Sequence, residues 1–306
     1  MFQIQKSQNG KNKLLQIISD CNTTKAKICL NNGGNLEQFI VNGNEIISGL
    51  THLPYNQTYA SSILFPFANR VKDGKYRFMS KDYCLECNET KAQNALHGLI
   101  FNKKFVLVDE NISRKSALVK LSYSESEPHP GFPFLFTIDL IYKISTNKIE
   151  LKVEVSNTGK KSFPFTIGWH PYFKIYDKSK SLLRLKSSKK IDSDERNITT
   201  GIKNITTPNP LLLNNINLDD AFILDKNKVM IETLSYKAKL TFSAPSNYLQ
   251  LYTPKNSNTI AIEPMTGVSD SFNNGIGLKK LNPNEKFNVG WSINILKISE
   301  FNFIKK

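Results

Sequence analysis

Arginine is scarce in this chain. Only five arginines occur among 41 basic residues, although the formal net charge is +15. Arginine recognises phosphates and base edges better than lysine does, and the lysines are scattered along the sequence. We therefore expect a solvated, lysine-rich surface and no nucleic-acid partner.

Long apolar runs are also missing. No stretch of about 18 consecutive apolar residues occurs, which argues against a membrane-spanning helix, and the first residues lack the apolar core of a signal peptide. We expect a soluble, cytoplasmic protein with no membrane partner, either a monomer or a homodimer.

Cysteine is sparse, with four residues in 306. Cys84 and Cys87 have the C-x-x-C spacing of half a zinc knuckle or of a redox pair, but no second pair and no nearby histidine completes a metal set. We expect a structural role for this pair and predict neither a metal nor another cofactor, while the role of the two thiols stays open.

The hydrophobic fraction of 40% and the 19 phenylalanines are sufficient for a large packed core. A chain of this length has room for two average domains. No linker, change in composition or internal repeat divides it, so we predict one domain over residues 1–306.

Period-two alternation of apolar and polar residues recurs along the chain and is typical of half-buried strands. It is clearest over residues 149–155 and 287–295, with shorter examples at 119–123, 136–140, 238–242 and 249–252, and residues 82–87 also have a strand-like sequence. Turn signals at 73–74, 157–159, 273–275 and 282–283 separate such runs. Helical periodicity of comparable length is missing. The pattern predicts an all-β fold, an antiparallel sandwich or barrel.

Four segments interrupt the alternation with polar residues in apolar surroundings. They contain Asn69-Arg70, His97, His170 and Glu263. Each has a simpler interpretation: an ion pair at the surface for Arg70, a turn cap for His97, a hydrogen-bonded core histidine for His170 and an exposed strand end for Glu263. Taken singly, the simpler interpretation is favoured, so the functional argument depends on the set.

As a set, the motifs resemble the aldose 1-epimerase, or galactose mutarotase, family. In that family N-R-[IV] with G-x-[YF], N-x-L-H-G, H-P-Y-F, D-x-x-F and E-P follow one another in this order. The matching segments span residues 60–290 and read Asn69-Arg-Val with Gly74-Lys-Tyr, Asn94-Ala-Leu-His-Gly98, His170-Pro-Tyr-Phe173, Asp219-Asp-Ala-Phe222 and Glu263-Pro.

The resemblance implies a large antiparallel β-sandwich of the galactose mutarotase type, with an open cleft that holds a pyranose. It also implies roles for individual residues: Glu263 as catalytic base, His170 as catalytic acid, and Asn69, Arg70, His97 and Asp219 as sugar-binding residues. A shift of one residue in the alignment would exchange Asp219 with Asp220, and this choice stays open.

The implied reaction interconverts the α and β anomers of a hexose by opening and closing the ring. It needs one group that takes a proton from the anomeric hydroxyl and one that gives a proton to the ring oxygen. We expect Glu263 to be ionised and nearby carboxylates to keep His170 protonated. Trp169, Tyr172 and Phe173 are expected as walls of the cleft, although a position in the core suits Phe173 at least as well.

Other functions stay open at this point. Lys72 and Lys75 near Arg70 suggest an epimerase for a modified or phosphorylated sugar, and loss of turnover would leave a carbohydrate-binding protein. Glycoside hydrolysis would need a second catalytic carboxylate. A metal site at His97, His170 and Glu263 lacks the usual H-x-H spacing.

The sugar itself cannot be inferred. The best-known galactose-specific members have T-N-H-S-Y around the histidine that His170 matches, whereas this chain has Gly168-Trp-His-Pro-Tyr172. The polar, weakly patterned residues 192–215 are predicted to form a long loop near the cleft, where loops often set specificity.

Overall fold

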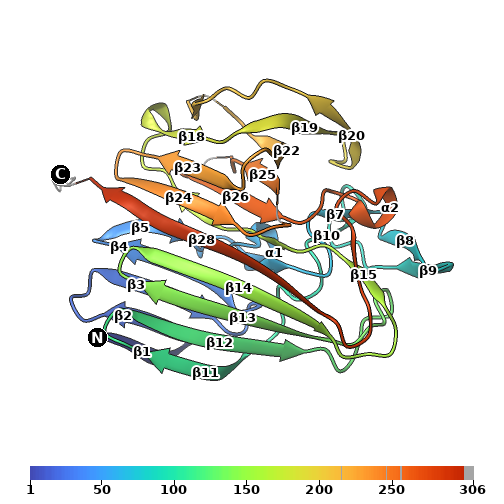
Figure 1. Ribbon diagram of the computed structural model, residues 1–306, viewed down its shortest axis with the longest axis horizontal. Helices are drawn as coiled ribbons and strands as arrows, with labels where there is room; N and C mark the ends of the chain where they lie inside the picture. The colour runs from blue at the N-terminus through green and yellow to red at the C-terminus, as the bar shows by residue number, and fades with distance from the viewer. Residues whose placement is uncertain (215, 246, 256, 300–306) are drawn as a thin grey trace.

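The computed structural model describes residues 1–299 except 215, 246 and 256, and two antiparallel sheets dominate it (Figure 1). Within these residues, the first sheet has thirteen strands. In spatial order they are β1 (Phe2–Asn9), β2 (Asn12–Ser19), β3 (Thr24–Cys29), β4 (Asn35–Val41), β5 (Asn44–Ser48), β17 (Tyr172–Lys174), β26 (Thr259–Met265), β25 (Tyr248–Tyr252), β22 (Asp219–Leu224), β19 (Ser187–Ser193) and β20 (Thr199–Asn204). In addition, β16 (Gly168–Trp169) pairs with β26, and β6 (Ile63–Leu64) pairs with β16.

The second sheet has nine strands in the described part of the chain. They are β11 (Val106–Ile112), β12 (Ser116–Ser124), β13 (Phe136–Ser145), β14 (Lys148–Asn157), β28 (Lys286–Ile298), β24 (Tyr236–Phe242), β23 (Lys228–Glu232), β18 (Leu182–Arg184) and β21 (Leu211–Leu212). Figure 1 shows β12, β13, β14 and β28 side by side.

Short elements fill the remaining connections. Three two-stranded sheets join β7 (Arg70–Lys72) with β10 (Asn94–Leu96), β8 (Lys75–Phe78) with β9 (Lys81–Cys84), and β15 (Phe163–Phe165) with β27 (Lys279–Leu281). The described helices are single turns: α1 (Tyr55–Thr58), α2 (Ser271–Asn274) and the 3-10 turn η1 (Lys178–Lys180). None of the described helices is long and apolar enough to cross a membrane.

The strands predicted from alternation are confirmed, and so is the all-β sandwich. The alternating segments 149–155 and 287–295 lie within β14 and β28, which pair with each other in register from Lys148 to Ser156. The four shorter segments lie within β12, β13, β24 and β25. In β14, Leu151 and Val153 are buried while Lys152 between them is exposed, as period-two burial requires.

Three local predictions need correction. The strand expected over residues 82–87 ends at Cys84, so Cys87 lies outside it. The turn expected at 273–275 is the end of α2, where Gly275 adopts the left-handed conformation. The segment 192–215 is no single loop, because it contains the hairpin strand β20 and also β21, and Asn215 itself lies outside the described residues.

The core lies between the two sheets. Trp169 of β16 stacks on Trp291 of β28 with ring centroids 6.1 Å apart, and the hydroxyl of Tyr142 in β13 donates a hydrogen bond of 2.9 Å to the carbonyl oxygen of Gly34. One cluster of buried apolar residues extends in sequence from Phe2 to Ile295. This shared core favours the single domain predicted for 1–306, which stays a prediction, and residues 300–306 lie outside the described part.

A group of phenylalanines forms one end of this core. Phe163 is fully buried, and its ring centroid lies 5.6–6.4 Å from those of five neighbours: Phe65, Phe132, Phe134, Phe136 and Phe165. Phe136 belongs to β13 of the second sheet and Phe163 and Phe165 belong to β15, whereas Phe65, Phe132 and Phe134 lie in connections between strands. A substitution of Phe163 therefore alters the packing of all of these segments.

Phe163→Ala should lower the free energy of unfolding by about 3–5 kcal/mol, because it removes a buried ring and leaves a cavity. The matched control is Val108→Ala on β11, whose side chain is 52% exposed; it should change the free energy by less than about 0.5 kcal/mol. Chemical denaturation of the three proteins measures both values. A similar loss in the two variants would contradict this account of the core.

Candidate active site

The central strands of the first sheet carry apolar side chains on one face and polar ones on the other. Gln250 of β25 lies opposite Glu263 of β26, and Tyr252 lies opposite both Asp219 of β22 and Ala261 of β26. Side chains opposite each other, or two residues apart, share a face of a sheet. Asp219, Gln250, Tyr252 and Glu263 therefore occupy one face, and the residues between them face the core.

The same alternation separates Asp219 from Asp220. Asp220 lies opposite Leu251, a core residue, and its carboxylate forms an ion pair with Lys190. Asp219 accepts a hydrogen bond of 2.8 Å from Gln250 Nε2. The geometry therefore favours Asp219 over Asp220 as the residue that shares a site with Glu263.

The strands β7 and β10 bring two of the sequence motifs together. Arg70 lies opposite Leu96 in this small sheet, and the backbone N–H of His97 donates a hydrogen bond of 2.9 Å to the carbonyl oxygen of Asn69. Asn69 and His97 both have φ of +63°, a left-handed conformation that is uncommon outside glycine and often marks functional sites.

The residue after His97, Gly98, must be a glycine for steric reasons. Its φ is +80°, and a Cβ at this position would collide with the backbone carbonyl of Phe65. The backbone N–H of Leu99 donates a hydrogen bond of 2.8 Å to that same carbonyl oxygen. The turn that presents His97 therefore requires this close approach of two backbones.

His170 is held by backbone hydrogen bonds to the segment that follows α1. Its N–H donates to the carbonyl oxygen of Ser62 (3.1 Å), and its own carbonyl accepts from the N–H of Ser61 (2.8 Å). The imidazole stacks on Tyr172 with ring centroids 4.9 Å apart and meets His97 edge-on at 5.2 Å. These contacts fix the ring in place.

All six residues proposed from the sequence line one cavity of about 250 Å³, which we call the central cavity. They are Asn69, Arg70, His97, His170, Asp219 and Glu263. The sequence motifs are separated by up to about two hundred positions, and the fold brings them together.

Glu263 and His170 form a buried pair at the base of this cavity. His170 Nε2 lies 3.4 Å from Glu263 Oε1, and the two side chains are 6% and 3% exposed. Burial raises the pKa of Glu263 well above its usual range, an effect that Asp219 increases and Arg70 opposes. Burial also lowers the pKa of His170 to about 4. The expectation that nearby carboxylates keep His170 protonated is therefore wrong for the protein without ligand.

These shifts favour a pair that holds one proton in total. Burial disfavours a lone carboxylate and a lone imidazolium alike. A protonated Glu263 beside a neutral His170, and a Glu263 carboxylate beside a His170 imidazolium, contain the same number of protons and have no net charge. They differ only by transfer of that proton between the two side chains.

Arg70 is held by a residue that the sequence did not reveal. Glu89 accepts from Arg70 Nε at 2.9 Å and from Arg70 Nη2 at 2.7 Å, and it also accepts from Asn94 Nδ2 at 2.9 Å. Burial raises the pKa of Glu89, but the hydrogen bonds and charge of Arg70 outweigh that effect and lower the pKa overall. Arg70 Nη1 also donates to Asn69 Oδ1 at 2.9 Å.

Gln250 is the second polar residue that was missed. It donates to Asp219, and its Oε1 accepts a hydrogen bond of 3.4 Å from Asn69 Nδ2. The signal was present in the sequence, since Gln250 is a polar residue at an alternate position of a strand flanked by Leu249 and Leu251. Glu89 lies outside any strand and carried no comparable signal.

The expected aromatic walls are only partly correct. Tyr172 lines the central cavity, and its hydroxyl donates to the carbonyl oxygen of Thr58 at 3.2 Å. Trp169 instead belongs to the core between the sheets, and Phe173 has the core position that was its alternative. Tyr252, which was not singled out, also lines the cavity.

Part of segment 192–215 does lie near the site. Asp192, Asp194 and Asn197 line a neighbouring cavity of about 210 Å³ that shares Arg70 and Asp219 with the central cavity. The segment therefore contributes to the surroundings of the site as a hairpin, not as the long loop that was expected.

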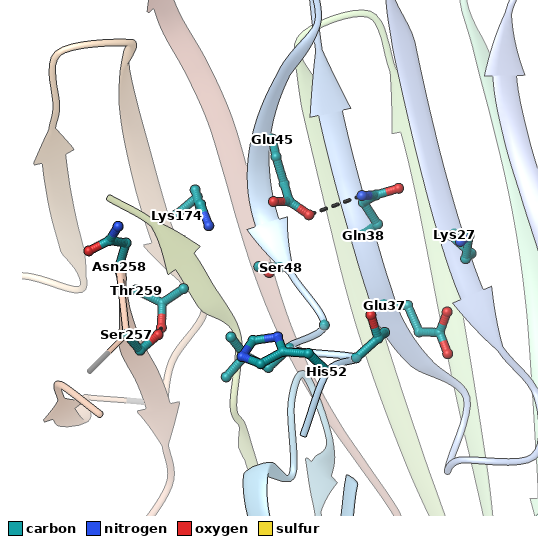
Figure 2. Close-up of a pocket in the computed structure, with 13 residues that line it drawn as sticks. Lys27, Glu37, Gln38, Glu45, Ser48, His52, Lys174, Ser257, Asn258 and Thr259 are labelled. Carbon is teal, nitrogen blue, oxygen red and sulfur yellow. Dashed lines mark hydrogen bonds between the residues drawn. The ribbon is translucent and has the colours of Figure 1, made fainter. Parts of the chain in front are cut away.

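A separate cavity of about 440 Å³ lies over β3, β4, β5 and β17, and Figure 2 shows its lining. We call it the polar pocket. Glu45 accepts a hydrogen bond of 3.0 Å from Gln38 there, and Lys174 faces the same space (Figure 2). It is larger than the central cavity, but no ion pair between a histidine and a carboxylate is found among its described residues. It lacks the acid–base pair of the central cavity.

Within the described residues, no group of three or more histidine, cysteine, aspartate or glutamate side chains is placed to hold a metal ion. In that same part of the chain, the Nδ1 atoms of His97 and His170 are buried without a hydrogen-bond partner. The two residues themselves line the central cavity.

Comparison with known proteins places this chain in a family. A family model described as "Aldose 1-epimerase" matches residues 15–294, so the chain belongs to the aldose 1-epimerase family. The uncharacterized protein YihR of Escherichia coli K12 is 22% identical over 271 residues, which cover 80% of this chain and 82% of YihR.

Solved structures show the same fold. A galactose mutarotase-like protein from Clostridium acetobutylicum has a TM-score of 0.87 at 22% identity, covering 97% of this chain and 99% of that protein. A galactose 1-epimerase from Lactobacillus acidophilus NCFM has a TM-score of 0.81 at 16% identity, covering 98% and 99%. At these identities the likeness concerns the fold alone.

The buried histidines predict a specific dependence of stability on pH. Burial, with added repulsion from His170 and Arg70, lowers the pKa of His97 well below its usual value. This contribution to stability is present above the unfolded pKa near 6.5 and is lost as the pH falls toward the folded value. His97→Asn, which tolerates a positive φ, should reduce the loss of unfolding free energy between pH 7 and pH 5 by up to about 2 kcal/mol.

The control for this experiment is His52→Asn, because His52 is exposed. It should retain the full pH dependence. Denaturant unfolding of the wild type and both variants at the two pH values gives the comparison. Equal pH dependence in wild type and His97→Asn would contradict the assignment of His97 as a buried neutral group.

Proposed function

We propose that this protein is a mutarotase that interconverts the α and β anomers of an uncharged hexose, with Glu263 and His170 as the proton-transfer pair. The observation that carries the proposal is the buried pair 3.4 Å apart, in a cavity lined by hydrogen-bonding groups. Membership of the aldose 1-epimerase family supports the reaction type.

The proposed reaction moves two protons and exchanges no atoms with a cofactor. Glu263 takes the proton of the anomeric hydroxyl as the C1–O5 bond breaks, and His170 gives a proton to the ring oxygen. The aldehyde formed at C1 then rotates about the C1–C2 bond. Closure on the other face returns the proton from the C5 hydroxyl to His170 and the proton on Glu263 to the new anomeric hydroxyl.

The reactive form of the pair is the ion pair, with a carboxylate on Glu263 and a proton on His170. Burial disfavours both charges in the empty cavity. A bound sugar donates hydrogen bonds from its hydroxyls to the carboxylate and accepts one from the imidazolium, and such bonds favour the charged forms. Substrate binding therefore helps to prepare the pair for its own reaction.

The remaining cavity residues are proposed to hold the sugar. Asp219 accepts from a hydroxyl, and Asn69 and His97 supply further polar groups at the cavity wall. The bidentate contact with Glu89 fixes the guanidinium of Arg70, so that its remaining donor positions have a defined direction toward the sugar.

The charge of the cavity favours an uncharged sugar over a phosphorylated one. Among the described lining residues, Arg70 is the one lysine or arginine, and it is already paired with Glu89. Asp219 and Glu263 line the same cavity. A phosphate would meet two carboxyl groups without an unpaired cation to balance it. A protein that binds sugars without turnover is the remaining alternative, and measured rates distinguish the two.

The protein should accelerate the approach to optical equilibrium of freshly dissolved α-D-glucose or α-D-galactose, measured by polarimetry. Glu263→Gln and His170→Asn should each lower kcat by roughly 100-fold or more, because each removes one proton-transfer group. The control is Glu45→Gln in the polar pocket, which changes a carboxyl group outside the central cavity; its rate should equal that of the wild type. No acceleration of either sugar would reject a mutarotase, and near-normal rates in the first two variants would reject the assigned roles.

A further inference from the structure

The turn that joins β19 to β20 lies beside the candidate active site, where it lines part of the cavity that neighbours the central one. Asp194 closes this turn, because its Oδ1 accepts hydrogen bonds of 2.9 Å from the N–H groups of Arg196 and Ile198. Asn197 has a φ of +57°, a left-handed conformation that asparagine tolerates. The backbone of the turn therefore sets where the side chains of Arg196 and Asn197 begin.

The guanidinium of Arg196 contacts the segment that leads into β10. Its Nε donates a hydrogen bond of 2.9 Å to the carbonyl oxygen of Ala92. Its Nη2 donates to Asn94 Oδ1 at 3.0 Å and to the carbonyl oxygen of Gln93 at 3.2 Å. The same nitrogen also donates to Asp73 at 2.7 Å. Arg196 is not among the described residues that line either cavity, so its partners are protein groups.

Asn94 connects Arg196 with Glu89. Its side chain is fully buried, and a carboxamide has an oxygen that only accepts hydrogen bonds and a nitrogen that only donates them. Because Oδ1 accepts from Arg196, Nδ2 is directed to Glu89 Oε2, at 2.9 Å, and to the carbonyl oxygen of Arg196, at 3.3 Å. Arg196 therefore fixes the direction of this buried amide.

Glu89 in turn holds Arg70 by the bidentate contact described above. Burial raises the pKa of Glu89. The hydrogen bonds and charge of Arg70, the hydrogen bond from Asn94 and the charge of Arg196 together lower this pKa below its ordinary value. Glu89 is therefore a carboxylate at neutral pH, and its hydrogen bonds to Arg70 are of the strong, charge-assisted kind.

The hydrogen bonds continue across the central cavity and return to the same turn. From Arg70 they pass through Asn69, Gln250 and Asp219. Asp219 Oδ2 also accepts from Asn197 Nδ2, at 3.3 Å. The bonds form a closed ring that leaves the turn at Arg196 and re-enters it at Asn197. The members of such a network support one another.

We infer that Arg196 is a positioning residue for Arg70, which it holds through Asn94 and Glu89. This role rests on the mutarotase function proposed above, in which Arg70 hydrogen-bonds the sugar. Arg196 holds the guanidinium of Arg70 in one direction before the sugar binds. A side chain that the ligand itself must order reduces affinity, so loss of Arg196 weakens sugar binding.

The first experiment measures KM and kcat for glucose and galactose by polarimetry. Arg196→Gln should raise KM by about 10-fold and change kcat by less than about 3-fold, since it weakens binding and leaves the proton-transfer pair in place. Arg196→Lys keeps the charge without the fork of donors, so its KM should lie between the two. The control is Arg184→Gln, which removes an ion pair with Glu232 at 2.9 Å on β18; it should leave both constants unchanged.

The second experiment separates positioning from a general loss of structure. Arg70→Gln should raise KM, and adding Arg196→Gln to it should raise KM no further, because the residue that Arg196 holds is then gone. A double variant whose change in KM is the product of the two single changes would overturn the inference. An unchanged KM in Arg196→Gln would overturn it too and leave a mutarotase. No acceleration of either sugar by the wild type would overturn the proposed function itself.

The third experiment needs no turnover. The chain has five arginines, so proton–nitrogen NMR spectra contain few arginine Nε–H signals, and the signal missing from Arg70→Gln is that of Arg70. Because Glu89 accepts from this group, its proton should exchange slowly with water. Arg196→Gln should speed this exchange by at least about 5-fold, whereas Arg184→Gln should not change it. An unchanged rate in Arg196→Gln would overturn the positioning role, whatever sugar the protein acts on.

Discussion

The period-two alternation of the central strands gives each strand a core face and a cavity face. In β25, Leu249 and Leu251 are buried in the core, whereas Gln250 and Tyr252 line the central cavity. A slip of one residue in the register would move every polar side chain into the core and every leucine into the cavity. The packing that holds the sheets together therefore also determines which side chains can meet a ligand.

Because the polar side chains share the cavity face of the sheet, a carboxyl group can be buried there beside a partner. Glu263 lies in β26, in which every residue is buried, and an isolated charge in such a place is strongly disfavoured. His170 compensates by offering a partner for the same proton at 3.4 Å. Burial disfavours a lone charge on either side chain, so the proton can pass between the two. A general acid–base reaction needs such a mobile proton.

Much of the fold could be predicted from the sequence, because alternation is a local signal. The segments that became β14 and β28 carry it over seven or more residues, and both were found. The order of the strands in space depends on contacts between distant segments, and no local pattern encodes it. The hairpin that contains β20 was missed for a related reason, since β20 is polar and mostly exposed and lacks the contrast that identifies a half-buried strand.

The residues of the site also fall into two groups, those that a local sequence pattern indicates and those that it does not. The motif residues could be found because their neighbours are distinctive, as with the glycine after His97. Glu89 could not, because its importance arises only from the position of Arg70 beside it in space. The ordinary chemistry of glutamate and histidine also suggested the wrong protonation of His170, because burial is a property of the folded chain and not of the residue.

The contact between Gly98 and the carbonyl of Phe65 links the site to the phenylalanine cluster of the core. Any side chain at position 98 would push these two segments apart, and His97 would move with its segment. A side chain at position 98 would therefore disturb the central cavity and the core together, although the two lie on opposite faces of the first sheet.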